Sequence, residues 1–356
     1  MRVLMDLHQN VLQNKDGIAA YSLGLIRAFA DTDKGVEVLG LVNPPVPEEV
    51  RKMGPAFRVL EGHIRTDSPK NMQWMTRVPF TVYHLAKNGL GVCRNHPAMV
   101  ATIFDMIPFT HPELVDAAYR RHITSYITKV LDHCKAIITL SRQSKRLITE
   151  LSGYPADRIF LAPPGAPTAM PRLQAPYRFI LYVGGFNWRK NVPNLIRAYA
   201  LLVRRGFGHK LVVLGERVRA YSQAAALVQE LGLQDKVLCP GYVSELTLRK
   251  LYAKADLVVY PSLAEGFGLP VLEAMTHGVP CVASRLPELE EIGGGACMYF
   301  DPTNVESIAD TMALVLGDPS TGAKMVYTGR ARALAYTWSN TVEQTVAAYR
   351  LAAGGR

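Results

Sequence analysis

The sequence predicts an α/β protein of two domains, each built on a parallel β-sheet. First, its 356 residues exceed the ~100–150 residues of a typical single domain, while 49% hydrophobic and 20% charged residues are ordinary for a globular protein. Second, short apolar runs alternate with longer helical patterns, which is typical of β-α-β units. Third, a Pro- and Ala-rich stretch over 161–176 has no periodicity and indicates a linker.

The expected strands divide into four before this linker and six after it. In chain order they are Arg2–Leu7, Val36–Val42, Met99–Phe104 and Ala136–Leu140, then Arg178–Val183, Lys210–Leu214, Lys236–Leu238, Leu257–Tyr260, Pro280–Ala283 and Met298–Phe300. Residues 61–98 mix apolar and basic side chains, which suits a helix either packed on the core or lying on an anionic membrane. The first domain is therefore expected over 1–172 and the second over 173–337.

Charge and composition narrow the classes of partner. The net charge is +10, and residues 1–175 alone carry 21 Lys/Arg against 15 Asp/Glu. No nucleic-acid-binding motif is recognisable, so an anionic lipid surface or a phosphorylated substrate is the expected partner. The chain has no run of ~20 apolar residues and no signal peptide, and its five cysteines lack metal-ligand spacing. A cytoplasmic protein is expected.

The segment from Tyr260 to Ser284 carries the strongest chemical signal. A glycine-containing loop, Gly266-Phe267-Gly268-Leu269, follows an expected strand, and Pro270 suits the first position of a helix. Glu265 would lie on the loop and Glu273 in the first helical turn, so the two carboxylates could contact one ligand while the loop N–H groups approach a phosphate. The alternative is an ordinary glycine turn in which Glu273 only complements the helix dipole.

As a whole, this segment resembles the signature of retaining glycosyltransferases of family four, a group that includes sucrose synthases and many bacterial lipopolysaccharide and mannosyl transferases. The pattern Glu-Gly-Phe-Gly-Leu-Pro-x-Leu-Glu-Ala-Met matches residue for residue from Glu265. The resemblance implies the GT-B fold, in which two Rossmann-like domains face each other across a cleft. It also implies that Glu265 contacts the donor sugar and Glu273 the ribose, and that the tail, about 338–356, crosses back to the first domain.

Resemblance to the same family extends upstream. Arg189 and Lys190 match an Arg-Lys pair that binds the donor diphosphate, and they follow a strand and precede a helix, where ligands of open α/β sheets bind. Two cations there can neutralise a leaving diphosphate without Mg²⁺. By resemblance, the backbone near Tyr242 and Val243 receives the nucleobase. The alternatives are a solvated surface pair and an ordinary turn.

In the first domain the match is looser. Gly17 opens a helix near the expected donor phosphate, but Asp16 replaces a second glycine of the family pattern. Asp105 matches the second residue of a His-Asp pair whose histidine is Phe104 here, so Asp105 is expected either to orient the acceptor hydroxyl or only to cap a turn. The Asp-x-Asp at 31–33 is interpreted as a solvated loop, and no metal is predicted.

Together these features predict a metal-independent, retaining hexosyltransferase without a cofactor. Its donor would be GDP-mannose or another UDP- or GDP-hexose, and its acceptor a glycan or lipid-linked sugar in bacterial surface polysaccharide synthesis. The protein would be cytoplasmic and peripheral on the inner face of the plasma membrane. Because Phe104 departs from the pattern, a catalytically silent donor-binding subunit is one alternative, and a sugar-nucleotide epimerase of the same architecture is another.

Overall fold

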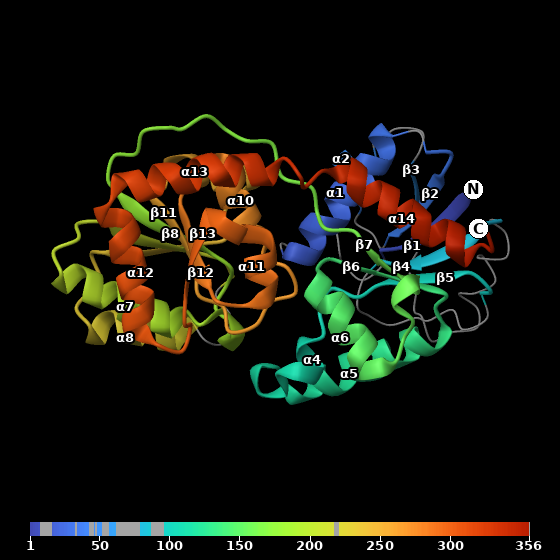
Figure 1. Ribbon diagram of the computed structural model, residues 1–356, viewed down its shortest axis with the longest axis horizontal. Coiled ribbons are helices and arrows are strands. Elements are labelled where there is room, and N and C mark those ends of the chain that lie inside the picture. The colour runs from blue at the N-terminus through green and yellow to red at the C-terminus, as the bar shows by residue number, and fades with distance from the viewer. Residues whose placement is uncertain are drawn as a thin grey trace. The chain divides into compact units, whose positions relative to one another are not determined.

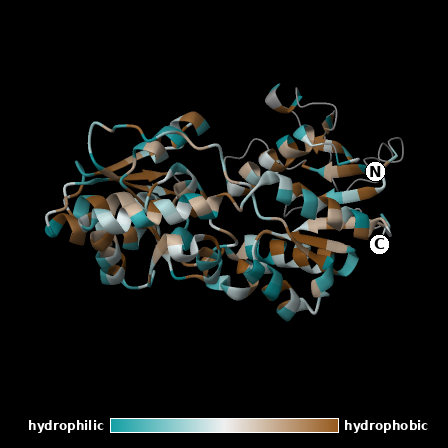
Figure 2. Cartoon of the chain, turned by 45° about the horizontal axis from the view of Figure 1, so that its top comes forward, coloured by the Kyte–Doolittle hydropathy of each residue, from teal (hydrophilic) through white to brown (hydrophobic). Residues whose placement is uncertain are grey.

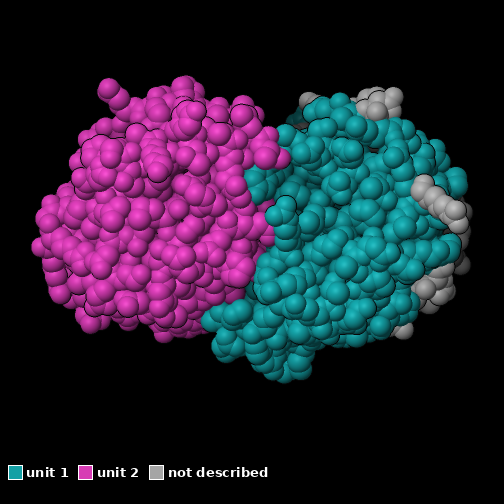
Figure 3. Space-filling view, in the orientation of Figure 1, with its two compact units in different colours: residues 1–165, 336–356 teal, residues 166–335 magenta. Residues whose placement is uncertain are grey.

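The chain divides into two compact units, which Figure 3 colours separately. Residues Met1–Gly165 and Tyr336–Arg356 form the first unit, and Ala166–Ala335 form the second. The computed structural model describes residues 1–7, 16–32, 34–42, 46, 48–51, 57–61, 79–86, 96–216 and 221–355. The chain leaves the first unit at Gly165, seven residues before the boundary expected from sequence, and returns at Tyr336.

The first unit is built on a seven-stranded sheet in the order β3-β2-β1-β4-β5-β6-β7, and all of its strand pairs are parallel. The strands are β1 (Arg2–Asp6), β2 (Glu37–Val42), β3 (Phe57–Glu61), β4 (Val82–Leu85), β5 (Met99–Thr102), β6 (Ala136–Thr139) and β7 (Ile159–Leu161). The strand order reverses between β1 and β4, as in doubly wound folds.

A six-stranded parallel sheet in the order β10-β9-β8-β11-β12-β13 forms the centre of the second unit. Its strands are β8 (Phe179–Val183), β9 (Lys210–Leu214), β10 (Val237–Gly241), β11 (Leu257–Tyr260), β12 (Cys281–Ser284) and β13 (Cys297–Phe300). Here the order reverses between β8 and β11. In open α/β sheets the crevice at such a reversal is where ligands bind, so this pair of strands is the first place to look for a site.

Helices connect the strands of both units, as Figure 1 shows. The first unit contains α1 (Gly17–Asp31), α2 (Glu48–Arg51), α4 (Ile107–Thr110), α5 (Ala117–His133), α6 (Arg142–Ser152) and α14 (Trp338–Ala352). The second contains α7 (Val192–Arg204), α8 (Tyr221–Glu230), α9 (Glu245–Lys254), α10 (Leu269–His277), α11 (Pro287–Gly293), α12 (Val305–Gly317) and α13 (Pro319–Ala333). Among the described residues, no helix is both long and apolar enough to cross a bilayer.

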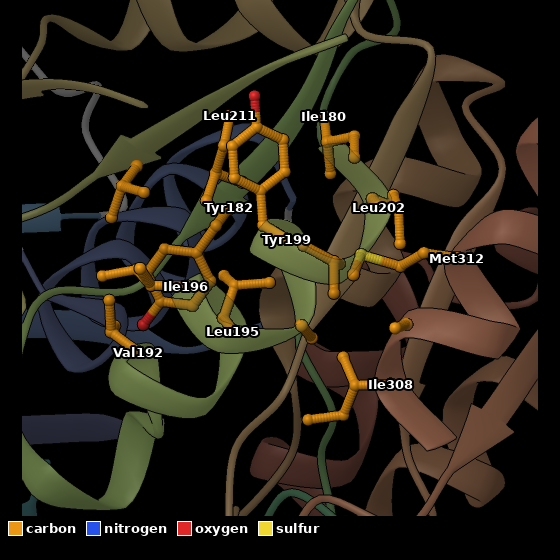
Figure 4. Packing of buried hydrophobic residues seen from close by; sticks show 14 of the residues in the cluster. Ile180, Tyr182, Val192, Leu195, Ile196, Tyr199, Leu202, Leu211, Ile308 and Met312 are labelled. Carbon is orange, nitrogen blue, oxygen red and sulfur yellow. The ribbon is translucent and has the colours of Figure 1, made fainter. Parts of the chain in front are cut away.

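The core of the second unit joins its sheet to the helices on one side. Side chains of α7 and α12, among them Tyr199 and Met312, pack with Ile180 and Leu211 of β8 and β9 in one buried cluster (Figure 4). The strands are coloured mainly as hydrophobic in Figure 2. Strands covered on both faces need continuous apolar sequence, which is why apolar runs located them.

Helix α14 is held in the first unit by close packing and by a buried hydrogen bond. A Cβ atom on Gly24 would lie 2.0 Å from the Trp338 ring, and one on Gly165 would lie 2.4 Å from the Trp338 backbone nitrogen, so only glycine admits this side chain. Further along the helix, the Tyr349 hydroxyl lies 2.7 Å from Nδ1 of His84 in β4. The tail therefore forms part of the first unit's core.

Three strands differ from the sequence prediction. β3, β4 and β7 were not expected, and the helix expected over 61–98 is wrong at 82–85, which form a buried central strand. The pattern misled because Val82–Leu85 contains the polar residue His84, fully buried between Thr102 and Tyr349. The other calls within that stretch, at 62–78 and 87–95, lie outside the described residues.

Candidate active site

Charged side chains from two separate segments meet beside β8 and β11. Arg189 and Lys190 lie on the short 3₁₀ turn Trp188–Lys190 that follows β8, and Glu265 lies on the loop that follows β11. The two strands are direct neighbours in the sheet. The cluster therefore lies outside the carboxyl ends of the strands at the reversal of strand order, where a ligand site is expected.

Both oxygens of the Glu265 carboxylate are paired with cations. Arg189 Nη1 lies 2.8 Å from Oε2, and Lys190 Nζ lies 2.6 Å from Oε1. Glu265 is only 8% exposed, and this burial alone would raise the pKa of its carboxyl group. The charges of Arg189 and Lys190 outweigh burial and lower the pKa to about 2. Glu265 is therefore ionised at neutral pH, and the cluster keeps one net positive charge.

Tyr260, the last residue of β11, completes this cluster. Its hydroxyl donates to Glu265 Oε1 over 2.8 Å and accepts from Lys190 Nζ over 2.6 Å. The ammonium also lies 4.8 Å from the centre of the Tyr260 ring, a cation–π distance. Glu265 Oε1 thus receives two donors and Oε2 one, so three of the roughly four acceptor positions of the carboxylate are used by these partners.

Asn191 fixes the turn that carries the two cations. It is the one described residue other than glycine with a positive φ, +56°. Its side-chain amide donates to the carbonyls of Pro261 and Pro302 over 3.0 and 2.7 Å, and the Leu263 N–H donates to the Arg189 carbonyl over 2.8 Å. These bonds tie the Arg189-Lys190 turn to the loop that carries Glu265. The sequence analysis did not single out Asn191. The available signal was an asparagine, a residue that tolerates a left-handed backbone, directly after the Arg-Lys pair.

The loop Gly266-Phe267-Gly268-Leu269 leads into α10. Gly268 has φ +108°, and a Cβ atom there would lie 2.4 Å from Leu289 Cδ2, so glycine is required at this position. The N-cap residue, Gly268, makes no side-chain capping bond, and the first N–H groups of α10 lie at the end of the helix that adjoins the loop. The expected helix start is one residue late, because Leu269 rather than Pro270 begins α10. Glu273 is consequently the fifth residue of α10 and lies beyond the first turn, whereas the sequence analysis had placed it in the first turn.

Glu273 forms a second, separate contact. Its Oε2 accepts a 2.6 Å hydrogen bond from the hydroxyl of Tyr252 in α9. Burial raises the pKa of this carboxyl group, and the Tyr252 bond opposes that rise. Tyr242 and Val243 lie between β10 and Ser244, the N-cap of α9, and the Tyr242 side chain is half exposed.

Three first-unit residues considered from sequence have local partners: Asp16, Asp105 and Phe104. Asp16 caps α1 by accepting a 2.8 Å hydrogen bond from the Ala19 N–H, so a carboxylate already lies at the helix end that begins with Gly17. Asp105 accepts a 3.1 Å bond from the Ile107 N–H at the start of α4, which is the capping role considered from sequence. Phe104 is buried edge-on against Tyr21.

Metal ligands were considered separately. Asp31 is the last residue of α1, and Asp33 lies outside the described residues. Within the described ranges, no group of three or more His, Cys, Asp or Glu side chains could hold a metal ion. The cysteines that the structure describes are all free thiols: Cys134, Cys239, Cys281 and Cys297.

Two doubly wound parallel sheets, one in each unit, are the architecture of the GT-B fold. Solved structures share it over almost the whole chain. Sucrose-phosphate synthase from Thermosynechococcus elongatus matches with a TM-score of 0.79 and 19% identity, covering 98% of each chain. WaaG, a glycosyltransferase involved in lipopolysaccharide biosynthesis, matches with a TM-score of 0.73 and 16% identity, covering 99% of this chain and 100% of WaaG. These likenesses establish the fold.

Sequence comparison establishes the family. A family model described as "Glycosyltransferase Family 4" matches residues 15–169, and one described as "Glycosyl transferases group 1" matches residues 170–332. The chain is 35% identical over 266 residues to O-antigen chain mannosyltransferase B of Escherichia coli, covering 71% of this chain and 70% of that protein. This protein therefore belongs to the family 4 glycosyltransferases.

Proposed function

We propose that this glycosyltransferase moves a mannosyl residue from a nucleoside-diphosphate sugar to a glycan or lipid-linked acceptor in the synthesis of a bacterial surface polysaccharide. Transfer retains the anomeric configuration and needs no metal ion. The observation that carries the proposal is the convergence of Arg189, Lys190 and Glu265 at the β8–β11 switch point. The mannosyl unit and the polysaccharide acceptor are suggested by the name of the E. coli relative.

In the proposed reaction, Arg189 and Lys190 neutralise the diphosphate. The bond between the sugar C1 and the distal phosphate oxygen breaks, and its electron pair leaves with that oxygen. The acceptor hydroxyl forms the new C1–O bond on the same face, and its proton passes to the departing phosphate oxygen. The protein supplies positioning and charge stabilisation rather than a nucleophile. Glu265 orients the donor sugar hydroxyls.

The remaining assignments follow the same proposal. Glu273 accepts from the ribose hydroxyls, and the backbone at Tyr242 and Val243 contacts the nucleobase. The N–H groups of the loop from Gly266 to Leu269 contact phosphate oxygens, because they precede an uncapped helix end. For the first unit, the proposal assigns Gly17 a contact with the donor phosphate and Asp105 the orientation of the acceptor hydroxyl. The Asp16 carboxylate, which caps α1 beside Gly17, would repel a phosphate there.

The test is a thermal-shift panel of GDP-mannose, GDP-glucose, UDP-glucose and UDP-N-acetylglucosamine, because a bound donor stabilises the folded state. GDP-mannose is expected to raise the melting temperature most, and the rise should be lost in Arg189→Ala. Transfer to a mannosylated lipid-linked acceptor, followed by NMR of the product, then reports the anomeric configuration. Stabilisation by a donor without turnover would favour the silent subunit, and stabilisation by none of the four would overturn the donor site.

A further inference from the structure

Tyr252 is a buried side chain of α9 that contacts the candidate ribose-binding carboxylate. It is 1% exposed, and its hydroxyl donates to Glu273 Oε2 over 2.6 Å. The two residues belong to different helices, and no hydrogen bond among the described residues involves the other oxygen, Oε1. The bond therefore fixes the carboxylate at one oxygen and leaves the second for a ligand.

The Tyr252 ring is itself held in place. The ring of His277, one turn beyond Glu273 on α10, stacks on it at 5.3 Å with an interplanar angle of 17°. His277 Nδ1 in turn lies 2.8 Å from the Glu273 backbone carbonyl. Glu273 is thus fixed from two directions, since its backbone is bonded to His277 and its carboxylate to the tyrosine that His277 supports.

We propose that Tyr252 is a positioning residue that orients the Glu273 carboxylate toward the ribose hydroxyls of the donor nucleotide. This inference rests on the proposed role of Glu273 in ribose binding. A carboxylate that is free to rotate loses side-chain entropy when it binds a diol, whereas one held at Oε2 presents Oε1 without that cost. The hydroxyl also stabilises the ionised carboxylate, the form that accepts strongly from a ribose hydroxyl.

The experiment compares GDP with 2′-deoxyGDP, and UDP with 2′-deoxyUDP, by calorimetry on the full chain. The measured quantity is the Kd of the 2′-deoxynucleotide divided by the Kd of the parent nucleotide. It is taken for the base, guanine or uracil, whose nucleotide binds more tightly. In the wild type, loss of the 2′-hydroxyl is expected to weaken binding about tenfold or more, since it removes a charge-assisted hydrogen bond. In Tyr252→Phe the ratio should fall to about threefold or less, while the Kd of the deoxynucleotide stays within about twofold and shows that the variant is folded.

The matched control is Tyr199→Phe. Tyr199 is another buried tyrosine of the second unit, and its hydroxyl donates to the His209 carbonyl over 2.7 Å. Its variant loses a similar bond without touching Glu273, so its ratio should equal that of the wild type. Glu273→Gln is the second comparison and should lose discrimination as Tyr252→Phe does.

The possible outcomes separate this inference from the function beneath it. If Glu273→Gln loses discrimination and Tyr252→Phe keeps it, Tyr252 is only structural and the inference is overturned while the ribose site stands. If Glu273→Gln also keeps the wild-type Kd ratio, or if the wild type does not distinguish the two nucleotides, Glu273 does not bind the 2′-hydroxyl. The ribose-binding role of Glu273 and the positioning role of Tyr252 are then both overturned. Equal losses in Tyr199→Phe and Tyr252→Phe would likewise count against the inference.

Discussion

Replacing Glu265 with glutamine tests whether this carboxylate is the counterion of Arg189 and Lys190 in the second unit. The substitution keeps the size of the side chain and removes the charge that pairs with Arg189 and Lys190. The pKa of Glu265 falls from its ordinary 4.5 to about 2, which corresponds to on the order of 3 kcal/mol of preference for the ionised form. Breaking a buried ion pair from one side costs a similar ~3–5 kcal/mol, because the partner charges stay buried without a counterion.

The expected result is a second unit destabilised by about 3 kcal/mol, or a fall in melting temperature of roughly 6–12 °C by calorimetry at pH 7. The same change removes the carboxylate charge that competes with a phosphate ligand for Arg189 and Lys190. GDP should therefore raise the melting temperature of Glu265→Gln by more than that of the wild type, although sugar transfer is lost. The matched control is Glu290→Gln, which breaks an exposed 3.0 Å pair with Arg285 worth only ~0–1 kcal/mol.

The pH profile gives a second readout with a definite sign. Because the folded-state pKa of Glu265 is depressed, its stabilising contribution is fully present above the unfolded value near 4.5 and is lost as pH falls toward about 2. Glu265→Gln should therefore lose less stability than the wild type over that window. A destabilisation no larger than that of Glu290→Gln, or a weaker response to GDP than in the wild type, would refute the view that Glu265 is the counterion of both cations.

Three further predictions follow from the site and from the charge of the chain. Transfer should survive EDTA if, as proposed, Arg189 and Lys190 neutralise the diphosphate in place of a metal; loss of turnover that Mn²⁺ restores would contradict this and turn attention to Asp31 and Asp33. Asn191→Gly should weaken GDP binding as much as Asn191→Ala, since both variants lose the bonds to Pro261 and Pro302. The free energy of unfolding should be about 1–2 kcal/mol lower for Asn191→Ala than for Asn191→Gly, because only glycine adopts a positive φ freely. Wild-type affinity for GDP in Asn191→Gly would show that these bonds do not position the cations. The protein should float with anionic but not neutral vesicles, and this binding should fade with salt, given the +10 net charge; equal flotation with both would argue for a soluble acceptor.

The location of the charged cluster beside β8 and β11 could be predicted from sequence because it depends on local patterns. Arg189-Lys190 follow one apolar run and Glu265 follows another, and in a parallel sheet residues after strands gather at the carboxyl edge. The family signature around Glu265 added the same conclusion independently. What the sequence left undetermined was that these residues pair with one another. Lys190 and Glu265 are 75 residues apart, and only the adjacency of β8 and β11 brings them within 2.6 Å.

The tyrosines that contact the two glutamates were missed for a related reason. Tyr260 was considered only as the end of an expected strand, and Tyr252 was not singled out, because an aromatic residue satisfies an apolar pattern whether or not its hydroxyl has a partner. The tertiary structure turns those hydroxyls toward Glu265 and Glu273. Asn191 is a similar case, since its left-handed backbone follows from carbonyls supplied by two distant segments.

The sequence by itself therefore determined the fold class, the family and the two segments that form the charged cluster, because periodicity and motif spacing are local properties of the chain. The tertiary structure alone decided which strands complete the first sheet and which side chains form hydrogen bonds or ion pairs with one another. β4 shows the reason most clearly. Its His84 contradicts an apolar strand until Thr102 and Tyr349, 265 residues further on, satisfy both ring nitrogens. A buried polar group is tolerated only when its partners are present, and those partners come from the folded chain.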